Sequence, residues 1–192
     1  MKLAVLGGSF NPPHIGHLSL AEDVRIAFGY DKVLFIPDRN LGSYVAKQIP
    51  EKEIVCWDGF CISHNRVRSD ELDMVRKHRG KIKILVHPEC SPDVVEKADF
   101  VGSTSQIIKY VSKADEKEFV IGTEMGILHS LEHQNPHKKF YLLSPSLICS
   151  NMKKTRLEDV YRALKDEIYE IKVDKDIMAA AKKSLDLMLK IS

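Results

Sequence analysis

Residues 33–42 read VLFIPDRNLG, and they join two parts of the chain whose sequences favour different chemistries. The four apolar residues at 33–36 predict a buried strand, which Pro37 ends. Asp38 then stands where its carboxylate can accept hydrogen bonds from the first backbone N–H groups of a following helix. The stretch is therefore expected to be a strand followed by a capped helix, and the residues on its two sides have to be interpreted separately.

The composition is that of a globular protein with a core of its own. The chain has 192 residues, of which 44% are hydrophobic and 29% are charged, and its formal net charge is +2. Such a chain can bury a core without disulfides or metal ions, and the near balance of charges predicts no interaction with nucleic acid. No apolar run is long enough to span a membrane and the N-terminus does not resemble a secretory leader, so we expect a cytoplasmic protein.

Four cysteines are too few and too scattered for a disulfide scaffold, and a cytosolic setting would keep them reduced. Reduced thiols serve either as metal ligands or as small apolar residues of a core. The residue types alone leave both roles open for Cys56, Cys61, Cys90 and Cys149.

Strand and helix patterns alternate after residue 37. Strands are predicted at residues 53–57, 81–86, 99–102, 118–122 and 138–143. Helices are predicted at residues 37–48, 69–78, 91–98, 103–114, 123–134, 155–167 and 174–191. For the helix at 155–167, Thr155 and Glu158 have the spacing of a capping box. This alternation is typical of three-layer α/β units with short parallel sheets, in which ligands bind at loops that follow strands.

The segment GGSFNPPHIGH at residues 7–17 lies between a predicted first strand and a predicted helix at residues 18–29. Its glycines allow a ligand to approach the backbone, and its two histidines can face the same anion as the free N–H groups of the helix start. The segment resembles the nucleotide-binding signature of the nucleotidyltransferases, most closely that of nicotinate-nucleotide adenylyltransferase, with a Rossmann-like strand-turn-helix-strand. The resemblance implies binding of ATP with Mg²⁺ by Gly8, Phe10, His14 and His17.

That resemblance covers about residues 1–37. The second phosphate-binding segment of the same enzymes, S-[ST]-T-x-I-R, has no good counterpart in the sequence. The alternative is a strand, turn and helix that fold in the same way and bind no nucleotide.

A second resemblance covers residues 37–192. The motifs PDRNLGSYVA, WDGFCISH, VHPECSPDVVEKADFVGSTSQIIK, FVIGTEMGILH and ICSNMKKTRLEDV occur in this order, and they resemble the later part of quinolinate synthase. That family condenses iminoaspartate with dihydroxyacetone phosphate in NAD biosynthesis. It builds three α/β units around a 4Fe-4S cluster, and each unit contributes one cysteine. The resemblance implies the same substrates and cofactor for this chain.

The quinolinate synthase resemblance also implies a role for seven residues. Cys61 and Cys149 match two of the cluster ligands. This match is chemically sensible, since thiolates are the usual ligands of iron-sulfur clusters. Glu89 matches a general base and His87 matches a second catalytic residue beside it. The residues that match substrate contacts are His64, Ser103 and Thr104. Taken singly, each has a structural alternative, such as a loop histidine, a surface carboxylate or a helix N-cap.

The chain departs from quinolinate synthase at its beginning. The first unit, with its C-P-M-like cysteine loop, and the Y-V-N start of the second unit have no counterpart in the sequence. We therefore expect a hybrid α/β unit over residues 1–64 and a third quinolinate synthase-like unit, with C-terminal helices, over residues 65–192. A third cluster thiolate would have to come from a dimer partner or from one of the other two cysteines.

Three functions follow from the sequence. The favoured one is quinolinate synthase-like condensation, impaired to the extent that the first unit is needed. The second is ATP-dependent nucleotidyl transfer. The third is a non-catalytic α/β protein in which a tetrahedral zinc ion is held by ligands drawn from Cys56, Cys61, His64, His87 and Cys90.

Overall fold

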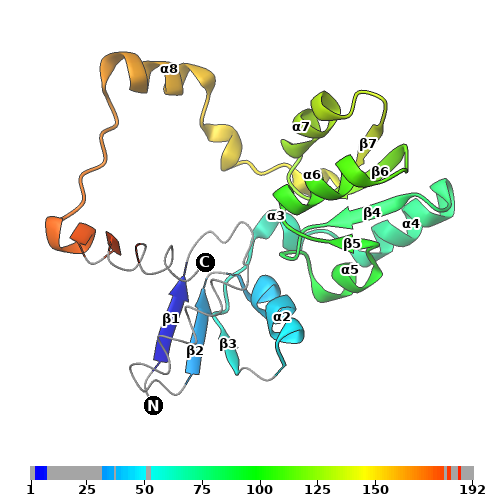
Figure 1. The fold of residues 1–192 in the computed structure, drawn as a ribbon, viewed down its shortest axis with the longest axis horizontal. Helices are drawn as coiled ribbons and strands as arrows, with labels where there is room; N and C mark the ends of the chain where they lie inside the picture. Colours follow the sequence, from blue (N-terminus) through cyan, green and yellow to red (C-terminus); the bar gives the residue numbers. More distant parts are fainter. Residues whose placement is uncertain are drawn as a thin grey trace.

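The chain forms two parallel sheets, shown in Figure 1. The structure is a computed structural model, and it describes residues 3–7, 32–36, 38–50, 53–179, 181–182 and 186. The connection predicted to bind a nucleotide and the helix predicted after it lie outside the described residues.

The first sheet has three parallel strands in the order β1-β2-β3. They are β1 (Leu3–Gly7), β2 (Lys32–Ile36) and β3 (Ile54–Cys56). The pairing of Leu3 with Lys32 begins a continuous register between β1 and β2. Helix α2 (Arg39–Gln48) follows β2, and its buried Leu41 and Val45 pack against Ile54. The strand expected at residues 33–36 and the helix capped by Asp38 are both confirmed.

The second sheet has four parallel strands in the order β5-β4-β6-β7. They are β4 (Lys83–Val86), β5 (Phe100–Val101), β6 (Glu118–Gly122) and β7 (Lys139–Leu142). The helices before and between these strands are α4 (Ser69–Arg79), α5 (Pro92–Lys97), α6 (Thr104–Lys113) and α7 (Ile127–Gln134). Parallel neighbours require such crossover helices, because each chain segment has to return to the same end of the sheet.

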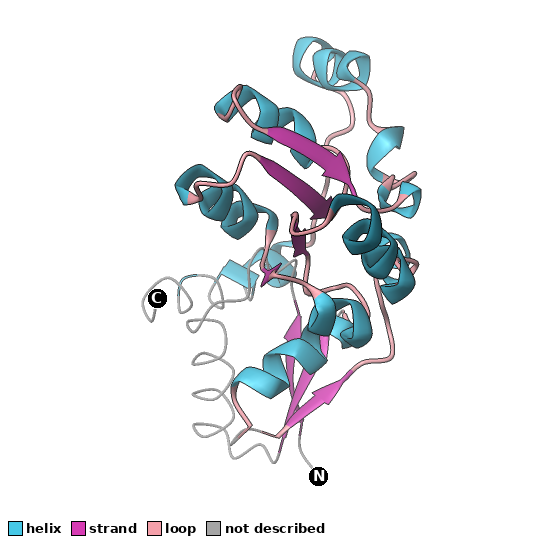
Figure 2. Ribbon diagram, turned by 90° about the vertical axis from the view of Figure 1, so that its right-hand side faces the viewer, coloured by secondary structure: helices cyan, strands magenta, loops and turns pink. Residues whose placement is uncertain are grey.

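Alternate residues of the central strands bury opposite faces of this sheet. Ile84 and Val120 belong to a core that includes Leu72 of α4 and Val94 of α5. Leu85 and Phe119 belong to the opposite core. Helices α6 and α7 complete that second core with Ile107, Val111, Ile127 and Leu131. Helices therefore cover both faces of the sheet, as Figure 2 shows, and the predicted α/β architecture with parallel strands is confirmed for this unit.

The remaining elements connect the sheets or leave them. Helix α3 (Ile62–Asn65) lies between the two sheets in Figure 1, beside the 3-10 turn η1 (Pro145–Leu147). A second turn, η2 (Met152–Lys154), leads to α8 (Leu157–Asp166), which stands away from both sheets. No residue of α8 is buried.

Two predicted helix starts were wrong. Helix α7 begins at Ile127 rather than at residue 123, because residues 123–126 form a turn after β6. Helix α8 has Arg156, not Thr155, as its N-cap, and the backbone N–H of Arg156 donates to the Asp159 carboxylate. Among the described helices, none has both the length and the apolar character that crossing a membrane requires.

Candidate functional site

The candidate site is built from loops that follow parallel strands of both sheets. Asp38 comes just after β2, and the loop that leads to Cys61 follows β3. In the second sheet, His87 directly follows β4 and Thr123 directly follows β6. Parallel strands bring their carboxyl ends to one edge of a sheet, and this edge is where open α/β folds bind ligands.

Cys61, His64 and Glu89 form a compact group of side chains that could hold a metal ion. His64 Nδ1 lies 3.1 Å from Cys61 Sγ and 3.0 Å from Glu89 Oε2. The ligand atoms of the three residues all lie within 4.8 Å of one another. Sequence positions 61 and 64 come together because one turn of helix α3 places residues three apart on the same face. The group can therefore bind a metal ion or hold an ionised carboxylate beside an imidazolium.

Two residues of the PDRN motif fix the loops that carry this group. Asp38 Oδ2 accepts a 2.7 Å hydrogen bond from the backbone N–H of Cys61, while Oδ1 accepts from the N–H groups of Asn40 and Leu41. Asn40 Nδ2 donates at 3.0 Å to the backbone carbonyl of Glu89. The stretch that joins the two predicted parts of the chain therefore ties the thiol loop to the carboxylate loop.

His87 lies against His64 and completes the polar cluster. The two imidazole rings stack with centroids 4.8 Å apart. His64 Nε2 lies 3.0 Å from the Thr123 hydroxyl oxygen, and His87 Nδ1 accepts from the backbone N–H of Glu89 at 3.3 Å. The structure thus brings His64, His87 and Glu89 together with Cys61, and the roles that the resemblance implies for them stay predictions.

The surroundings give the two histidines opposite charge states. Burial opposes protonation of His64, but its hydrogen bonds to Cys61 and Glu89 outweigh burial and raise its pKa to about 9. Burial and the neighbouring positive charge of His64 lower the pKa of His87 to about 4. Burial would raise the pKa of Glu89, yet the hydrogen bond from His64 and the nearby imidazoles lower it. Near neutral pH the cluster holds an imidazolium, a neutral imidazole and a carboxylate.

Cys149 lies on a neighbouring loop next to helix α3. Hydrogen bonds from the backbone N–H groups of Met152 and Asn151 lower the pKa of the Cys149 thiol, and the Ser63 hydroxyl acts in the same direction. The backbone N–H of Cys149 faces Glu124 Oε1 at 3.5 Å. Cys149 is not a member of the 4.8 Å group of Cys61, His64 and Glu89. A lowered thiol pKa favours the thiolate, which is the form that binds iron.

The other two cysteines are in environments that favour the neutral thiol. Cys90 is 1% exposed, its Sγ donates to the Gly122 carbonyl at 3.6 Å, and burial raises its pKa. Burial also raises the pKa of Cys56 in β3. Within the described residues, neither Cys56 nor Cys90 belongs to the compact metal-binding group, and neither does His87. Of the five zinc ligands proposed from the sequence, this group therefore contains Cys61 and His64, and it adds Glu89.

Ser103 and Thr104 begin helix α6 at the same edge of the sheet as His87. Val101 pairs with Val86, and each strand ends there, so the following residues of β4 and β5 are neighbours. The Ser103 side chain accepts from the backbone N–H of Gln106, and the Gln106 side chain accepts from the N–H of Ser103. Ser103 is 1% exposed. Its capping role is thus established, while substrate binding by Ser103 and Thr104 stays a prediction.

The structure does not test the residues predicted to bind a nucleotide. Gly8, Phe10, His14 and His17 all lie outside the described residues. The strands on either side of their segment, β1 and β2, are parallel neighbours.

Sequence reasoning missed four residues of the site. Asp38 was expected only as a helix cap, and Asn40, Thr123 and Glu124 were assigned no role. Glu124 is buried and accepts from the N–H of Gly126 at 2.7 Å, and its Oε1 lies 3.0 Å from Lys153 Nζ. Burial opposes ionisation of Glu124, but these partners lower its pKa. Their positions in the sequence could have indicated a role. Asp38, Thr123 and Glu124 each come shortly after a predicted strand, as His87 does.

The fold and the cluster define a class of protein. It is an α/β protein that gathers thiol, imidazole and carboxylate groups, all of them possible metal ligands, at the carboxyl ends of parallel strands. The family model described as Quinolinate synthetase A protein matches residues 18–190, and the chain belongs to this family. The match begins at residue 18, well before residue 37, where the sequence resemblance was expected to begin.

Curated relatives agree with the family match. The chain is 60% identical over 161 residues to a quinolinate synthase of Alkaliphilus metalliredigens, covering 84% of this chain and 53% of that protein. It is 52% identical over 164 residues to a quinolinate synthase of Caldicellulosiruptor bescii, covering 85% of this chain and 54% of that protein. It is 50% identical over 161 residues to a quinolinate synthase of Clostridium kluyveri, covering 84% of this chain and 53% of that protein. The chain spans about half the length of the curated relatives it matches.

Proposed function

We propose that the chain carries part of a quinolinate synthase site and acts in the condensation of iminoaspartate with dihydroxyacetone phosphate, a step of NAD biosynthesis. The observation that carries the proposal is the group of Cys61, His64 and Glu89 with His87 stacked on it, in a member of this family. A lone buried histidine or carboxylate has ordinary structural explanations. A buried imidazolium–carboxylate pair beside a thiol, at the ends of strands, is typical of functional sites.

The cofactor proposed for this site is a 4Fe-4S cluster, for which the chain supplies part of the ligand set. Cys61 is half-buried beside His64, and the lowered pKa of Cys149 favours its thiolate. These two residues would each bind one iron, and the high thiol pKa of Cys56 and Cys90 makes them poor third ligands. When bound, the cluster would supply a Lewis acid for oxygen atoms of the substrate.

The polar residues would manage protons and hold the substrate. Glu89 stays ionised because its pKa is lowered, and it can accept a proton from a substrate carbon or nitrogen as a general base. His64 remains protonated and holds that carboxylate in place while its Nε2 hydrogen bonds to Thr123. His87 stays neutral and can donate a hydrogen bond to a substrate oxygen. Ser103 and Thr104, at the start of α6, would face a substrate carboxylate or phosphate.

The proposed division into units follows the two sheets. A hybrid α/β unit over residues 1–64 would contain the three-stranded sheet, and a third quinolinate synthase-like unit over residues 65–192 would contain the four-stranded sheet. Asp38 and Asn40 cross this division through hydrogen bonds to Cys61 and Glu89. The site would therefore lie where the two units meet.

Iron binding tests the cofactor proposal. After anaerobic reconstitution, we expect iron and sulfide in the wild-type chain, with thiolate-to-iron charge-transfer absorbance, and a marked loss in Cys61→Ser and in Cys149→Ser. Cys56→Ser is the matched control and should keep the wild-type iron content. Equal iron content in all four proteins would contradict the proposal, and stoichiometric zinc without sulfide would favour the zinc alternative.

Quinolinate formation from iminoaspartate and dihydroxyacetone phosphate tests the reaction itself. Activity of the reconstituted chain should fall at least 100-fold in Glu89→Gln, because the amide cannot accept a proton. Glu96→Gln, on the exposed side of α5, is the control for the same chemical change. Equal activity of Glu89→Gln and Glu96→Gln would remove Glu89 from the mechanism.

Residues 1–17 lie outside the family match, and for them we keep a second proposal, ATP-dependent adenylyl transfer to nicotinate mononucleotide. The parallel pairing of β1 with β2 meets one requirement of a nucleotide-binding strand-turn-helix-strand unit, a requirement that other α/β units share. Release of pyrophosphate from ATP with Mg²⁺ and nicotinate mononucleotide, lost in His17→Ala, would support it. No release by the wild-type chain would end it.

A further inference from the structure

The turn that follows β6 contacts the surroundings of both candidate cluster ligands. It comprises residues 123–126, and we call it the β6 turn. Thr123 is buried, and its hydroxyl oxygen lies 3.0 Å from Nε2 of His64 on helix α3. Glu124 is the next residue, and its Oε1 lies 3.5 Å from the backbone nitrogen of Cys149. Two consecutive residues therefore reach the loops that carry the two thiols.

The core fixes the β6 turn on both sides. Strand β6 pairs with both β4 and β7, and its Phe119 and Ile121 are fully buried. After the turn, Ile127 and Leu131 of α7 pack in the same core as these two residues. The backbone N–H of Ile127 also donates to the Glu124 carbonyl at 3.2 Å. The position of the turn is thus determined by packing and needs no bound ligand.

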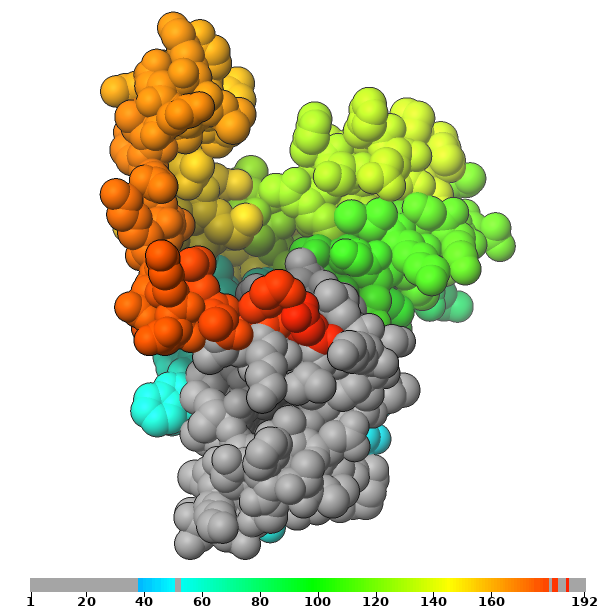
Figure 3. All heavy atoms as spheres, turned by 60° about the vertical axis from the view of Figure 1, so that its left-hand side comes forward, coloured from blue at the N-terminus to red at the C-terminus, as the bar shows by residue number. Residues whose placement is uncertain are grey.

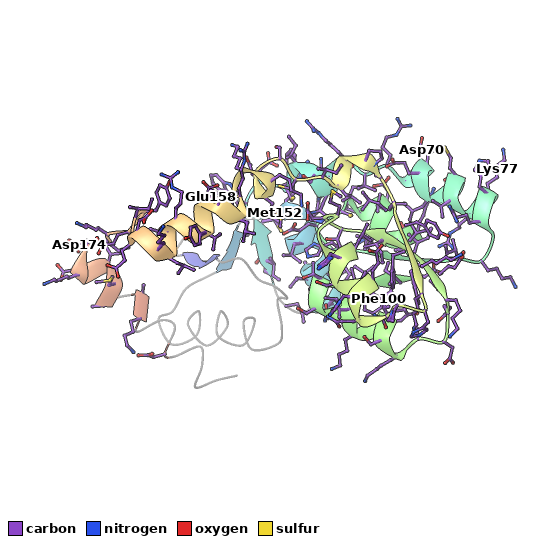
Figure 4. All side chains as sticks on the ribbon, turned by 90° about the horizontal axis from the view of Figure 1, so that it is seen from above. Asp70, Lys77, Phe100, Met152, Glu158 and Asp174 are labelled. Carbon is purple, nitrogen blue, oxygen red and sulfur yellow. The ribbon has the colours of Figure 1, made fainter. Side chains whose placement is uncertain are left out.

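The main chain of the β6 turn holds the Cys149 loop where it begins. The backbone N–H of Met125 donates at 3.0 Å to the carbonyl of Leu147, which is fully buried. The loop then closes one turn, because the N–H of Lys153 donates to the Cys149 carbonyl at 3.2 Å. Figure 4 shows Met152 in this segment, where the chain leaves the four-stranded sheet, and Figure 3 shows α8 beyond it as a separate projection.

The side chain of Glu124 holds the same loop where it ends. Its Oε1 lies 3.0 Å from Lys153 Nζ, and its Oε2 accepts from the backbone N–H of Gly126 at 2.7 Å. A Cβ atom at Gly126 would lie 2.8 Å from Oε2, so glycine leaves the space that the carboxylate occupies. The lysine ammonium also supplies the positive charge that offsets repulsion between a carboxylate and a nearby thiolate.

Stability alone explains this arrangement poorly. Burying a carboxylate costs desolvation free energy, and an ion pair with a half-exposed lysine compensates little of it. Metal ligands, in contrast, have to be held within about 0.5 Å of their working positions, and surrounding hydrogen bonds do this.

We propose that the β6 turn sets the separation of the two candidate cluster thiols. Thr123 would act through His64 on the helix turn that begins at Cys61, and Glu124 would act through Lys153 on the other thiol loop. Both are positioning residues in this proposal. It rests on the proposed function only in the identity of what the thiols bind, because the contacts themselves need no iron.

Amide hydrogen exchange of the full metal-free chain tests the contacts. Exchange across residues 148–153 should become about tenfold faster in Glu124→Gln and in Lys153→Met, because the loop loses a charge-assisted contact. Glu132→Gln and Lys154→Met make the same changes at exposed positions and should alter it by less than about twofold. Lys153 is itself half-exposed, so Lys153→Met should keep the thermal unfolding temperature of the wild type.

Three further variants separate charge from position. Lys153→Arg keeps the ion pair and should exchange like the wild type. Gly126→Ala keeps both charges but displaces Oε2, so it should exchange like Glu124→Gln. Thr123→Val removes the hydroxyl next to His64 and should speed exchange across residues 61–66 instead.

Iron release tests the consequence for the cluster. After anaerobic reconstitution, loss of iron to a chelator should be about tenfold faster in Glu124→Gln and Lys153→Met than in the wild type, with Lys153→Arg unchanged. Exchange or iron release that is equal in Glu124→Gln and Glu132→Gln would overturn the proposal, and so would a Lys153→Arg chain that behaves like Lys153→Met. A wild-type chain that takes up no iron would reject the proposed cofactor instead, and hydrogen exchange would then decide the positioning role by itself.

Discussion

At the residue scale, the carboxylate of Asp38 has the widest influence on the site. It accepts hydrogen bonds from three backbone N–H groups, those of Asn40, Leu41 and Cys61. Burial raises the pKa of Asp38, while the three N–H groups act in the opposite direction. A single side chain therefore both starts helix α2 and sets the position of a candidate cluster ligand.

Removing this carboxylate should affect stability and metal binding together. Asp38→Ala leaves three N–H groups without their acceptor, and we expect the free energy of unfolding to fall by about 2 kcal/mol. Iron retained after reconstitution should fall as well, because the Cys61 loop loses its anchor. Asp58→Ala is the control, since Asp58 is exposed and pairs with Arg39, and such exposed pairs contribute roughly 0–1 kcal/mol. Equal effects of the two variants would contradict this role of Asp38.

The two stacked histidines should give the metal-free protein a stability maximum near pH 6.5. The pKa of His64 is raised to about 9, so the stability it adds is complete below its unfolded value and is lost as the pH rises from 6.5 to 9. The pKa of His87 is lowered to about 4, so its contribution is complete above 6.5 and is lost as the pH falls from 6.5 to 4. The loss on each side should be on the order of 2–3 kcal/mol.

Urea unfolding between pH 4 and pH 9 measures the loss of stability on both sides of pH 6.5. His87→Asn should make the loss between pH 6.5 and 4 smaller, although carboxylates with lowered pKa, such as Glu89, still contribute there. His133→Asn, at an exposed position of α7, should leave the profile unchanged. The same slope in His87→Asn as in the wild type would show that His87 is not held neutral by folding.

At the element scale, the sequence predicts that a helix begins near a capping residue, but it does not always predict the residue at which the helix begins. Asp38 was predicted as a cap because a short polar side chain precedes an apolar helical pattern, and this prediction is confirmed. For Ser103 the N-cap was the structural alternative to a substrate contact, and the structure shows the cap. Thr155 has the same pattern, yet the helix begins one residue later with Asp159 bonded to the Arg156 N–H. The two starts differ by one residue and use similar acceptors, so local chemistry alone does not decide between them.

The cap of α6 can be tested by itself. Ser103→Ala removes the hydroxyl that accepts from the Gln106 N–H, and we expect the free energy of unfolding to fall by about 1 kcal/mol. Ser105→Ala makes the same chemical change at an exposed position inside the helix and should be neutral or slightly stabilising. If Ser103→Ala lowers quinolinate formation without lowering stability, the predicted substrate contact rather than the cap would explain its role.

At the scale of the whole molecule, periodicity predicted the parallel four-stranded unit well. Its strands are short apolar runs such as EFVIG, and its helices are amphipathic, so each element indicates its own type and its own buried face. The site was predicted through resemblance for Cys61, His64, His87 and Glu89. The links from Asp38 and Asn40 to those residues depend on the meeting of two sheets far apart in the sequence, which no local pattern encodes.

Deleting residues 157–192, which include α8, should leave the core intact. None of these residues that the structure describes is buried, and we expect the thermal unfolding temperature of a chain ending at Arg156 to match that of the full chain. Leu85→Ala, which removes a fully buried side chain from the sheet, should cost about 2–5 kcal/mol. A deletion as destabilising as Leu85→Ala would show that residues after Arg156 pack on the rest of the chain.

The exposure of α8 also has a consequence for the lifetime of the protein in a cell. Chaperones and proteases recognise accessible apolar segments, and degradation follows the population of accessible chain. Here residues 157–166 are accessible in the folded chain, without any unfolding step. Cleavage within this helix should therefore need no unfolding of the four-stranded unit, and its rate should not depend on the stability of that unit.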